Sequence, residues 1–405
     1  MPGRTTIPGF RSLLRFLRLA AADRALPPAA RAEAARDRRE GLGKDPGVDR
    51  AIEAAVDWLC EAQDRSLSAD GGVARHFSLR SGWSPSYPET TGYIVPTMLA
   101  CAAHLGRPEL RDRAKRMVDW LVSIQFPEGG FQGGVIGETP VVPVTFNTGQ
   151  ILLGLAAAHA EFGAEYRGPM ESAAQWLVAT QDTDGCWRRH PTPFAAPGEK
   201  SYETHVAWGL LEADRQAPGH GYGEAALRNV RWAIARQRSN GWFEACDLSD
   251  PTRPLTHTIG YALRGVLEAY RSSRDKFFLD AAVRTAEGIL RAIEPDGRLS
   301  GRLDAEWRGV ASWVCLTGSV QIAACLFMLF QETGDRRYCN AALAANAFVR
   351  CTVAIDGPAA TRGGVKGSFP VDGGYGRFTY LNWASKFLID ANFAERVIQR
   401  PNESG

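Results

Sequence analysis

The sequence SPSYPETTGYIVPTMLACAA at Ser84–Ala103 starts with polar and aromatic residues and continues as a mostly apolar stretch of helical length. Five similar stretches follow: VTFNTGQILLGLAAA at Val144–Ala158, SYETHVAWGLLEA at Ser201–Ala213, THTIGYALRGVLEA at Thr256–Ala269, LTGSVQIAACLFML at Leu316–Leu329 and TYLNWASKFLIDA at Thr379–Ala391. Aligned on their small and leucine positions, successive copies are 55 to 62 residues apart. A near-constant period of this size is typical of a repeat architecture.

A second motif precedes these stretches. It is found in WLCEAQ at Trp58–Gln63, WLVSIQ at Trp120–Gln125, WLVATQ at Trp176–Gln181 and WAIARQ at Trp232–Gln237. A glycine-containing turn follows each, at Asp70-Gly71-Gly72, Glu128-Gly129-Gly130, Asp184-Gly185 and Asn240-Gly241, and we expect the fifth and sixth turns at Asp296-Gly297 and Asp356-Gly357. Glycine after a periodic apolar segment indicates a helix end, so each repeat is predicted to be a helix, a loop and a second helix.

The charge pattern distinguishes the two helices of each repeat. The first alternates apolar residues with Arg, Asp and Glu, which predicts one solvated face, whereas the second carries few charges and is predicted to be buried on most sides. We therefore expect an all-α protein, an (α/α)6 toroid of six helical hairpins with the second helices inside. The expected division is a basic extension at 1–47, the toroid at 48–395 and a tail at 396–405.

The overall composition excludes some functions. Lys and Arg number 47 against 45 Asp and Glu, a net charge of +2, so no global positive field favours nucleic acid. Eight widely spaced cysteines without a CxxC motif favour a reducing compartment and a cytoplasmic location. No run of about 18 uncharged apolar residues predicts a membrane span. No cofactor and no metal ion are expected, and the sequence does not define an oligomeric state.

The N-terminal extension contains FRSLLRFLRLAAA, in which Phe10, Leu13, Leu14 and Leu17 would share one helix face beside three arginines. One interpretation is a peripheral membrane contact through residues 10–20. The alternative is a helix that packs on the toroid, or a poorly ordered arm. Residues 25–47 are predicted to be a linker that contains a helix.

The inner helices of a toroid start around one mouth of the central cavity, so functional residues are expected in their first turns. Phe146 is interpreted as core, but ionisable groups on otherwise buried helices are costly unless they are paired or used. The candidate catalytic residues are Glu89, Glu203, His205, His257 and Tyr261. The candidate substrate-binding residues, which include aromatic and cationic residues of the connecting loops, are Trp83, Tyr87, Tyr93, Asn147, Tyr202, Gln321, Lys366, Tyr375 and Trp383.

Some motifs resemble known families. WLVATQDTDGCW at Trp176–Trp187 resembles the QW repeat of terpenoid cyclases, and the whole pattern resembles the α/α toroid superfamily of terpenoid cyclases and protein prenyltransferases. The DxDD motif of squalene–hopene cyclases and the DDxxD motif of class I terpene synthases are absent. GWSPSYPETTGY, PLTHTIGYALRGVLEA, CLTGSVQ and GGVKGSFP resemble squalene-cyclase-like proteins of bacterial polysaccharide-biosynthesis clusters, and more remotely the toroid of glucuronyl C5-epimerases.

The resemblance implies a carbohydrate-active enzyme with a glycan or glycolipid substrate, a bacterial polysaccharide or its lipid-linked oligosaccharide. If Glu89 and Glu203 face each other, they would serve a glycoside hydrolase. If Tyr93, His205, His257 and Tyr261 transfer protons, the reaction is that of a lyase or C5-epimerase, with Lys366 or an arginine neutralising a uronate carboxylate. The alternatives are a terpenoid or prenyl cyclase-like enzyme, a zinc-dependent variant of it that uses three cysteines with His257, and a non-catalytic glycan-binding scaffold.

Overall fold

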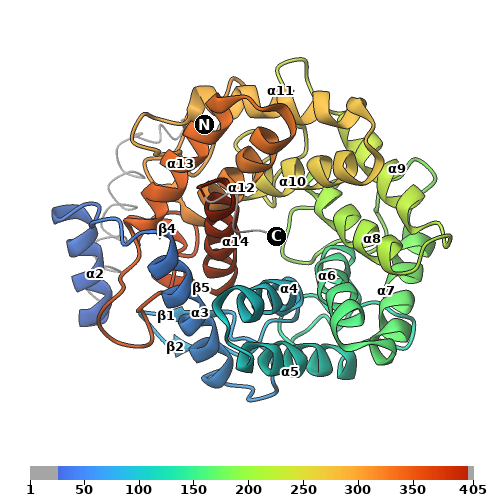
Figure 1. Ribbon diagram of the computed structural model, residues 1–405, viewed down its shortest axis with the longest axis horizontal. Helices are drawn as coiled ribbons and strands as arrows, with labels where there is room; N and C mark the ends of the chain where they lie inside the picture. Colours follow the sequence, from blue (N-terminus) through green and yellow to red (C-terminus); the bar gives the residue numbers. More distant parts are fainter. Residues whose placement is uncertain (1–25, 400–405) are drawn as a thin grey trace, which may run out of the picture.

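The computed structural model describes residues 26–399. The membrane-surface helix considered for residues 10–20 lies outside this range. Within it, twelve helices from α3 to α14 form two concentric rings (Figure 1). The outer ring consists of α3 (Val48–Asp64), α5 (Glu109–Ser123), α7 (Arg167–Thr180), α9 (Tyr222–Ile234), α11 (Lys276–Ala292) and α13 (Arg336–Arg350). The inner ring consists of α4 (Pro88–Leu105), α6 (Thr145–Phe162), α8 (Thr204–Gln216), α10 (Thr256–Ser273), α12 (Leu316–Thr333) and α14 (Asn382–Gln399). The predicted toroid fold is therefore confirmed.

Each inner helix packs against its two ring neighbours and an outer helix, and α14 closes the ring against α3 and α4. Small residues allow this close approach. A Cβ atom on Gly154 of α6 would lie 2.3 Å from the carbonyl oxygen of Gly92 in α4. This packing explains why the inner helices are apolar around most of their circumference, as the sequence predicts.

The repeated glutamine holds neighbouring outer helices together. The Nε2 group of Gln181 donates to the carbonyl oxygen of Gly185 in its own turn, 3.1 Å away, and to that of Ala225 in α9, 2.9 Å away. Gln63, Gln125 and Gln237 bridge their own glycine turn to the next outer helix in the same way. The motif is therefore the link between successive repeats.

The turn glycines have positive φ values and lie against the next outer helix. A Cβ on Gly241 or Gly297 would be about 2 Å from a carbonyl carbon or oxygen of α11 or α13. The sixth turn was predicted at Asp356-Gly357, and Gly357 does have a positive φ, but a Cβ atom on it would meet nothing within 4 Å, so Gly357 is not the glycine that contacts the next outer helix. The equivalent residue is Gly363, whose Cβ would lie 1.9 Å from the carbonyl oxygen of Ala54 in α3. This contact closes the ring.

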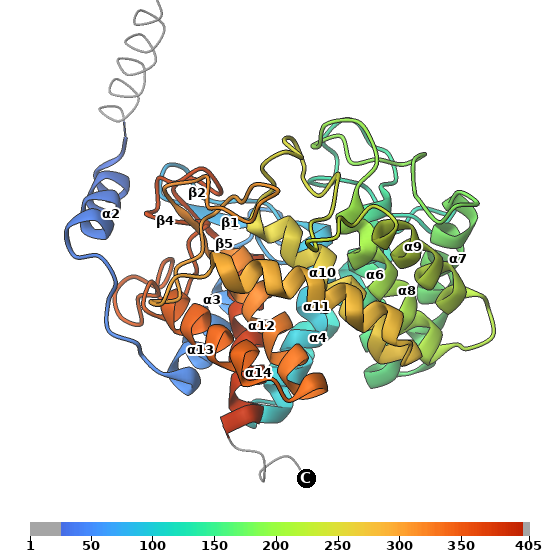
Figure 2. The ribbon, with the colours of Figure 1, turned by 90° about the horizontal axis from the view of Figure 1, so that it is seen from above.

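The long loops between outer and inner helices gather at the end where the inner helices begin (Figure 2). They contain a 3₁₀ turn at Ser201–Glu203 and short strands: β1 (His76–Ser78), β2 (Gly82–Trp83) and β5 (Thr379–Leu381) in one antiparallel sheet, and β3 (Val314–Cys315) paired with β4 (Ser368–Phe369). A second 3₁₀ turn, Ala164–Tyr166, lies in the short connection from α6 to α7. These strands are too short to form a β domain. They fix the loops over the mouth of the inner ring.

Helix α2 (Pro28–Arg39) lies outside the rings and covers the loop between β4 and β5. Leu26, Ala30 and Ala34 pack on Val371 and Phe378. The extension thus supports this loop from outside. No helix among residues 26–399 is both long and apolar enough to cross a membrane.

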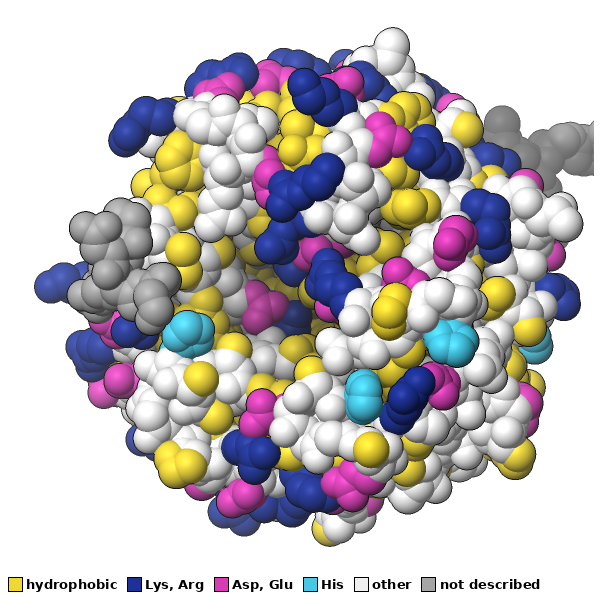
Figure 3. Space-filling view, turned by 45° about the vertical axis from the view of Figure 1, so that its right-hand side comes forward, with side chains coloured by type: hydrophobic (Ala, Val, Ile, Leu, Met, Phe, Trp, Pro, Cys, Tyr) yellow, Lys and Arg dark blue, Asp and Glu magenta, His cyan; other side chains and the backbone are white. Residues whose placement is uncertain are grey.

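Farther along the inner helices, the ring interior contains ion pairs. Arg264 in α10 pairs with Glu268 at 2.8 Å, and Lys386 in α14 pairs with Asp390 at 2.5 Å. Figure 3 shows a hollow at the centre of the ring with basic and acidic side chains around it. Because Glu268 and Lys386 are buried and paired with opposite charges, they have a satisfied structural role.

Candidate functional site

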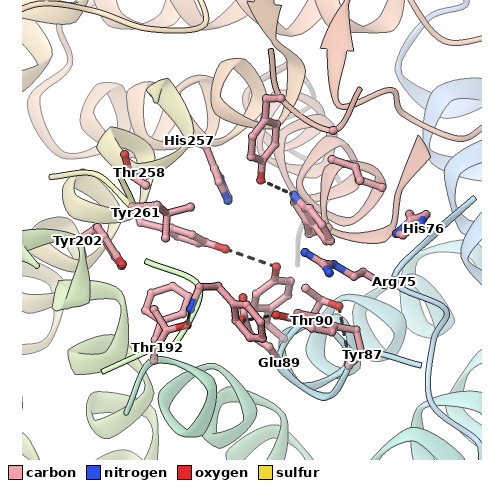
Figure 4. Close-up of a pocket in the computed structure, with 18 of the residues that line it drawn as sticks. Arg75, His76, Tyr87, Glu89, Thr90, Thr192, Tyr202, His257, Thr258 and Tyr261 are labelled. Carbon is pink, nitrogen blue, oxygen red and sulfur yellow. Dashed lines mark hydrogen bonds between the residues drawn. The ribbon is translucent and has the colours of Figure 1, made fainter. Parts of the chain in front are cut away.

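A cavity of about 350 Å³ lies at the mouth formed by the first turns of the inner helices (Figure 4). Its lining comprises Arg75, His76, Tyr87, Glu89, Thr90, Tyr93, Phe146, Thr192, Phe194, Tyr202, Leu248, His257, Thr258, Tyr261, Tyr375, Gly376, Thr379, Leu381 and Trp383. Eight of the predicted site residues are among them: Tyr87, Glu89, Tyr93, Tyr202, His257, Tyr261, Tyr375 and Trp383. The site prediction therefore coincides in large part with a real cavity.

Glu89 is the carboxylate of this lining. It stands in the first turn of α4 directly after Pro88, which starts the helix. The Tyr87 hydroxyl donates to Glu89 Oε2 at 3.4 Å. Burial raises the pKa of Glu89 to about 7, because loss of hydration disfavours the charged form more than Arg75 and the Tyr87 hydrogen bond favour it. A carboxyl group with this pKa can donate or accept a proton near neutral pH.

Arg75 supplies a positive charge on the same wall. Its guanidinium carbon lies 4.8 Å from the centre of the Tyr87 ring and 5.9 Å from that of Trp383. Arg75 is exposed, and no ion pair of its side chain occurs within residues 26–399. A stacked, unpaired arginine at a cavity wall is suited to bind an anionic group.

His257 approaches the cavity from α10, on the other side from Glu89 (Figure 4). Its Nδ1 lies 2.6 Å from Gln321 Oε1. With the Gln321 amide oriented in this way, Nδ1 must carry the proton, so Nε2 has a free lone pair. Burial lowers the pKa of His257 to about 4, which keeps the ring neutral at pH 7. His257 is thus a second group that can accept a proton.

Tyr261 stands between two histidines. Its ring centre is 4.4 Å from that of His257 and 4.3 Å from that of His205, and its hydroxyl lies 3.4 Å from the Tyr93 hydroxyl. Burial raises the pKa of both tyrosines well above 10, so both hydroxyls keep their protons. They form a neutral, hydrogen-bonding floor.

Tyr375 and Trp383 complete the aromatic wall. Trp383 Nε1 donates to the Tyr375 hydroxyl at 3.0 Å, which fixes both rings. Tyr375 comes from the loop that α2 covers, and Trp383 from the first turn of α14. Rigid aromatic faces next to polar groups can stack on sugar rings and hydrogen-bond their hydroxyls.

Several predicted residues lie behind the lining. Glu203 is 5% exposed, its Oε2 has no hydrogen-bond partner within residues 26–399, and burial raises its pKa to about 8. His205 is buried with Nδ1 2.6 Å from Gln150 Oε1, and burial lowers its pKa. Asn147 is also buried. The expectation that these three open onto the mouth is corrected, because the lining residues cover them.

Three substrate-binding candidates have structural contacts instead. Lys366 is 2% exposed, and its ammonium pairs with Asp37 at 2.5 Å and Glu33 at 3.1 Å in α2, so it cannot neutralise a substrate carboxylate in the cavity. Trp83 packs on Trp58 and Phe77. Gln321 orients His257 and does not line the cavity. These are corrections to the sequence interpretation.

The lining also contains residues that the sequence interpretation missed. They are Arg75, His76, Thr90, Thr192, Phe194, Leu248, Thr258, Gly376, Thr379, Leu381, and Phe146, which was interpreted as core. Arg75 follows the turn glycine Gly71 by four residues and immediately precedes the aromatic loop, and Arg189 occupies the same position after Gly185. No sequence signal distinguishes it from a solvated arginine.

The zinc-dependent variant requires several metal-ligating side chains that lie together. Within residues 26–399, no group of three or more His, Cys, Asp and Glu side chains could hold a metal ion. The cysteines considered for zinc are buried, and burial raises the pKa of Cys186, Cys246 and Cys315 to about 12. Nothing in the described chain therefore supports the zinc-dependent variant.

Residues 84–267 match the family model described as squalene-hopene cyclase C-terminal domain, which confirms the resemblance to the toroid superfamily. A comparison with curated proteins gives no match.

Among solved structures, the chain is similar to an unsaturated glucuronyl hydrolase specific for heparin, with TM-score 0.70, 17% identity, and 87% and 98% of the two chains covered. It is also similar to cellobiose 2-epimerase from Bacillus thermoamylovorans, with TM-score 0.67, 11% identity, and 86% and 98% covered. A D-mannose isomerase gives TM-score 0.69, 13% identity, and 87% and 97% covered. At these identities the similarity establishes the fold.

Proposed function

We propose that this protein is a carbohydrate-active enzyme that transfers a proton at a carbon next to the carboxylate of a uronate residue, as a polysaccharide lyase or C5-epimerase. The proposal rests on two residues that line the same aromatic cavity: Glu89, with a pKa of about 7, and Arg75, whose side chain has no ion pair within residues 26–399. The solved structures that share the fold include enzymes named for glucuronyl, cellobiose and mannose substrates, which supports a sugar ligand.

Arg75 would bind the uronate carboxylate and make the neighbouring C5–H bond more acidic by stabilising the negative charge that develops when the proton leaves. Glu89 or His257 Nε2 would accept that proton. In a C5-epimerase, the group on the other side of the cavity returns a proton to the opposite face of the ring. In a lyase, the electron pair of the C5–H bond forms the C4–C5 double bond, and the substituent at C4 leaves with its bonding electrons and is protonated.

The two-carboxylate hydrolase is less well supported. Glycoside hydrolases of that class need two carboxyl groups flanking the scissile bond. Glu89 is the only Asp or Glu among the lining residues of the described chain, and Glu203 lies behind them. The neutral histidine and tyrosines facing Glu89 suit proton transfer at carbon.

The test uses N-acetylheparosan, hyaluronan and alginate in deuterated water, with deuterium at C5 followed by NMR and unsaturated product by ultraviolet absorbance. We expect deuterium incorporation or unsaturation with one of them, about 100-fold or more slower in Glu89→Gln. Exchange of Glu138, an exposed loop residue, for Gln is the matched control and should have no effect. New reducing ends without deuterium or unsaturation would contradict the proposal and favour a hydrolase.

A terpenoid cyclase-like enzyme is the second candidate, because the match to the squalene-hopene cyclase model favours it. The ionisable lining counts against it, since an isoprenoid cavity is expected to be mostly apolar. Conversion of squalene or a prenyl diphosphate by the purified protein, with no exchange on uronates, would establish this alternative. We further place the enzyme in polysaccharide biosynthesis in the bacterial cytoplasm, in line with its free cysteines.

A further inference from the structure

Large apolar side chains are concentrated beside the cavity mouth. Among residues 26–399 eight such side chains are exposed, and four of them lie in two neighbouring loops: Ile136 (39%), Val141 (52%), Val142 (40%) and Phe194 (59%). We call these four residues the apolar rim. Half of the exposed large apolar side chains of the described residues therefore lie in two short loops. Single exposed apolar side chains are normal on a protein surface, whereas a cluster of them indicates a binding surface.

The two loops touch each other, so the rim is one surface. A Cβ atom on Gly134 would lie 2.7 Å from the ring of Phe194, which means that the ring rests on this glycine. The Gly133 N–H donates to the carbonyl oxygen of Val142 at 3.3 Å. Figure 2 shows both loops, between α5 and α6 and between α7 and α8, above the ends of the inner helices.

The exposure is built into the first loop. The buried Gln132 donates from Nε2 to the carbonyl oxygens of Val135 at 3.0 Å and Glu138 at 2.9 Å, and its Oε1 accepts from the Gly137 N–H at 3.4 Å. One buried side chain therefore holds the loop that presents Ile136, Val141 and Val142. A loop held in this way keeps these side chains in water, which is unfavourable unless something covers them.

The rim is continuous with the cavity. Phe194 both belongs to the rim and lines the cavity, together with Thr192 and Leu248. The Ala196 N–H donates to the carbonyl oxygen of Leu248 at 2.6 Å, which anchors the Phe194 loop to this wall. A ligand that leaves the cavity past Phe194 meets apolar side chains.

We propose that the substrate is a lipid-linked glycan, with the sugar in the cavity and the first part of its acyl or isoprenoid chain on the apolar rim. The inference rests on the proposed function and names the substrate class of the same site. A protein partner is disfavoured, because a stable interface needs about 20–30 residues on each side, and the rim offers four large apolar side chains. The first part of a flexible hydrocarbon chain, in contrast, is small enough for a surface of this size to cover it.

The test compares the affinities of methyl β-D-glucuronide, dodecyl β-D-glucuronide and dodecyl β-D-maltoside by calorimetry below the micelle concentration. Each methylene group buried on the rim is expected to raise affinity about fourfold, so the dodecyl glucuronide should bind at least about tenfold more tightly than the methyl glucuronide. The variant Val141→Ser/Val142→Ser should lose most of this advantage with unchanged affinity for the methyl glucuronide. Val397→Ser, at an equally exposed valine near the C-terminal end of α14, is the control and should keep it.

Equal affinities for the two glucuronides, or an advantage that survives in Val141→Ser/Val142→Ser, would overturn the inference. A wild-type dimer that the same variant dissociates in sedimentation velocity would also overturn it, because the rim would then cover a second copy. If dodecyl maltoside binds as tightly as dodecyl glucuronide and loses affinity in the variant, the lipid inference stands and the uronate specificity of the proposed function fails.

Discussion

Exchange of Glu89 for Gln isolates the cost of a buried carboxyl group. The variant keeps the size of the side chain and an oxygen that can accept from the Tyr87 hydroxyl, and removes only the titrating proton. Burial raises the pKa of Glu89 from 4.5 to about 7. At about 1.4 kcal/mol per pKa unit, this difference corresponds to about 3 kcal/mol of folding free energy.

The sign of the effect follows from proton linkage. Below pH 4.5 the carboxyl is protonated in both states, so wild type and Glu89→Gln differ by a constant amount. Between pH 4.5 and 7 the unfolded chain has released the proton while the folded chain retains it, so the stability of the wild type falls relative to the variant as pH rises. Above pH 7 the full penalty of about 3 kcal/mol is present.

Denaturant unfolding at pH 4, 5.5, 7 and 8.5, followed by fluorescence of the 11 tryptophans, measures this difference. Glu138→Gln, in an exposed loop, is the control and should show no pH-dependent difference. A difference between wild type and Glu89→Gln that stays constant over this range would refute the reasoning, because Glu89 would then titrate as in the unfolded chain. A wild type that gains stability relative to Glu89→Gln as pH rises would show that Arg75 outweighs burial.

Three further outcomes are expected. Gly363→Ala should destabilise the protein by several kcal/mol, or prevent folding, because the φ of +79° and the contact with α3 exclude a side chain. Gly357→Ala should cost only about 1 kcal/mol, because a Cβ atom there would meet nothing within 4 Å. Calorimetric melting of the two variants measures the difference. Gln181→Met should cost about 2 kcal/mol in urea unfolding, since two buried carbonyl oxygens lose their donor, and an unchanged midpoint would contradict the bridging role. Lys366→Met should destabilise the protein by about 3 kcal/mol, because it leaves Asp37 buried without its cation. Adding Asp37→Asn to this variant should restore part of the lost stability. If the losses of the two single variants add up in the double variant, the two residues do not form a stabilising ion pair.

The fold was predictable because its determinants are local and repeated six times. The glycine turn and the apolar inner helix recur in all six repeats and the bridging glutamine in four of them, so an error in one copy is corrected by the others. The exception is instructive. The Asp-Gly dipeptide led to the prediction of Gly357 as the sixth turn glycine. Closure of the ring depends instead on a contact with α3, about 300 residues earlier in the chain, and Gly363 makes this contact.

The sequence alone predicted that the first turns of the inner helices face one mouth, and Glu89, His257 and Tyr261 of those turns line the cavity. Only the tertiary structure decided which residues of those turns reach the cavity. Glu89, in the first turn of α4, lines the cavity, whereas Glu203, the last residue of the 3₁₀ turn before α8, is buried outside the lining. The sequence also shows no difference in role between Lys366 and Arg75, which are both loop cations. In the structure, Glu33 and Asp37 of α2 neutralise Lys366, whereas Arg75 lines the cavity. Side-chain partners that are distant in sequence leave no local pattern that could predict this.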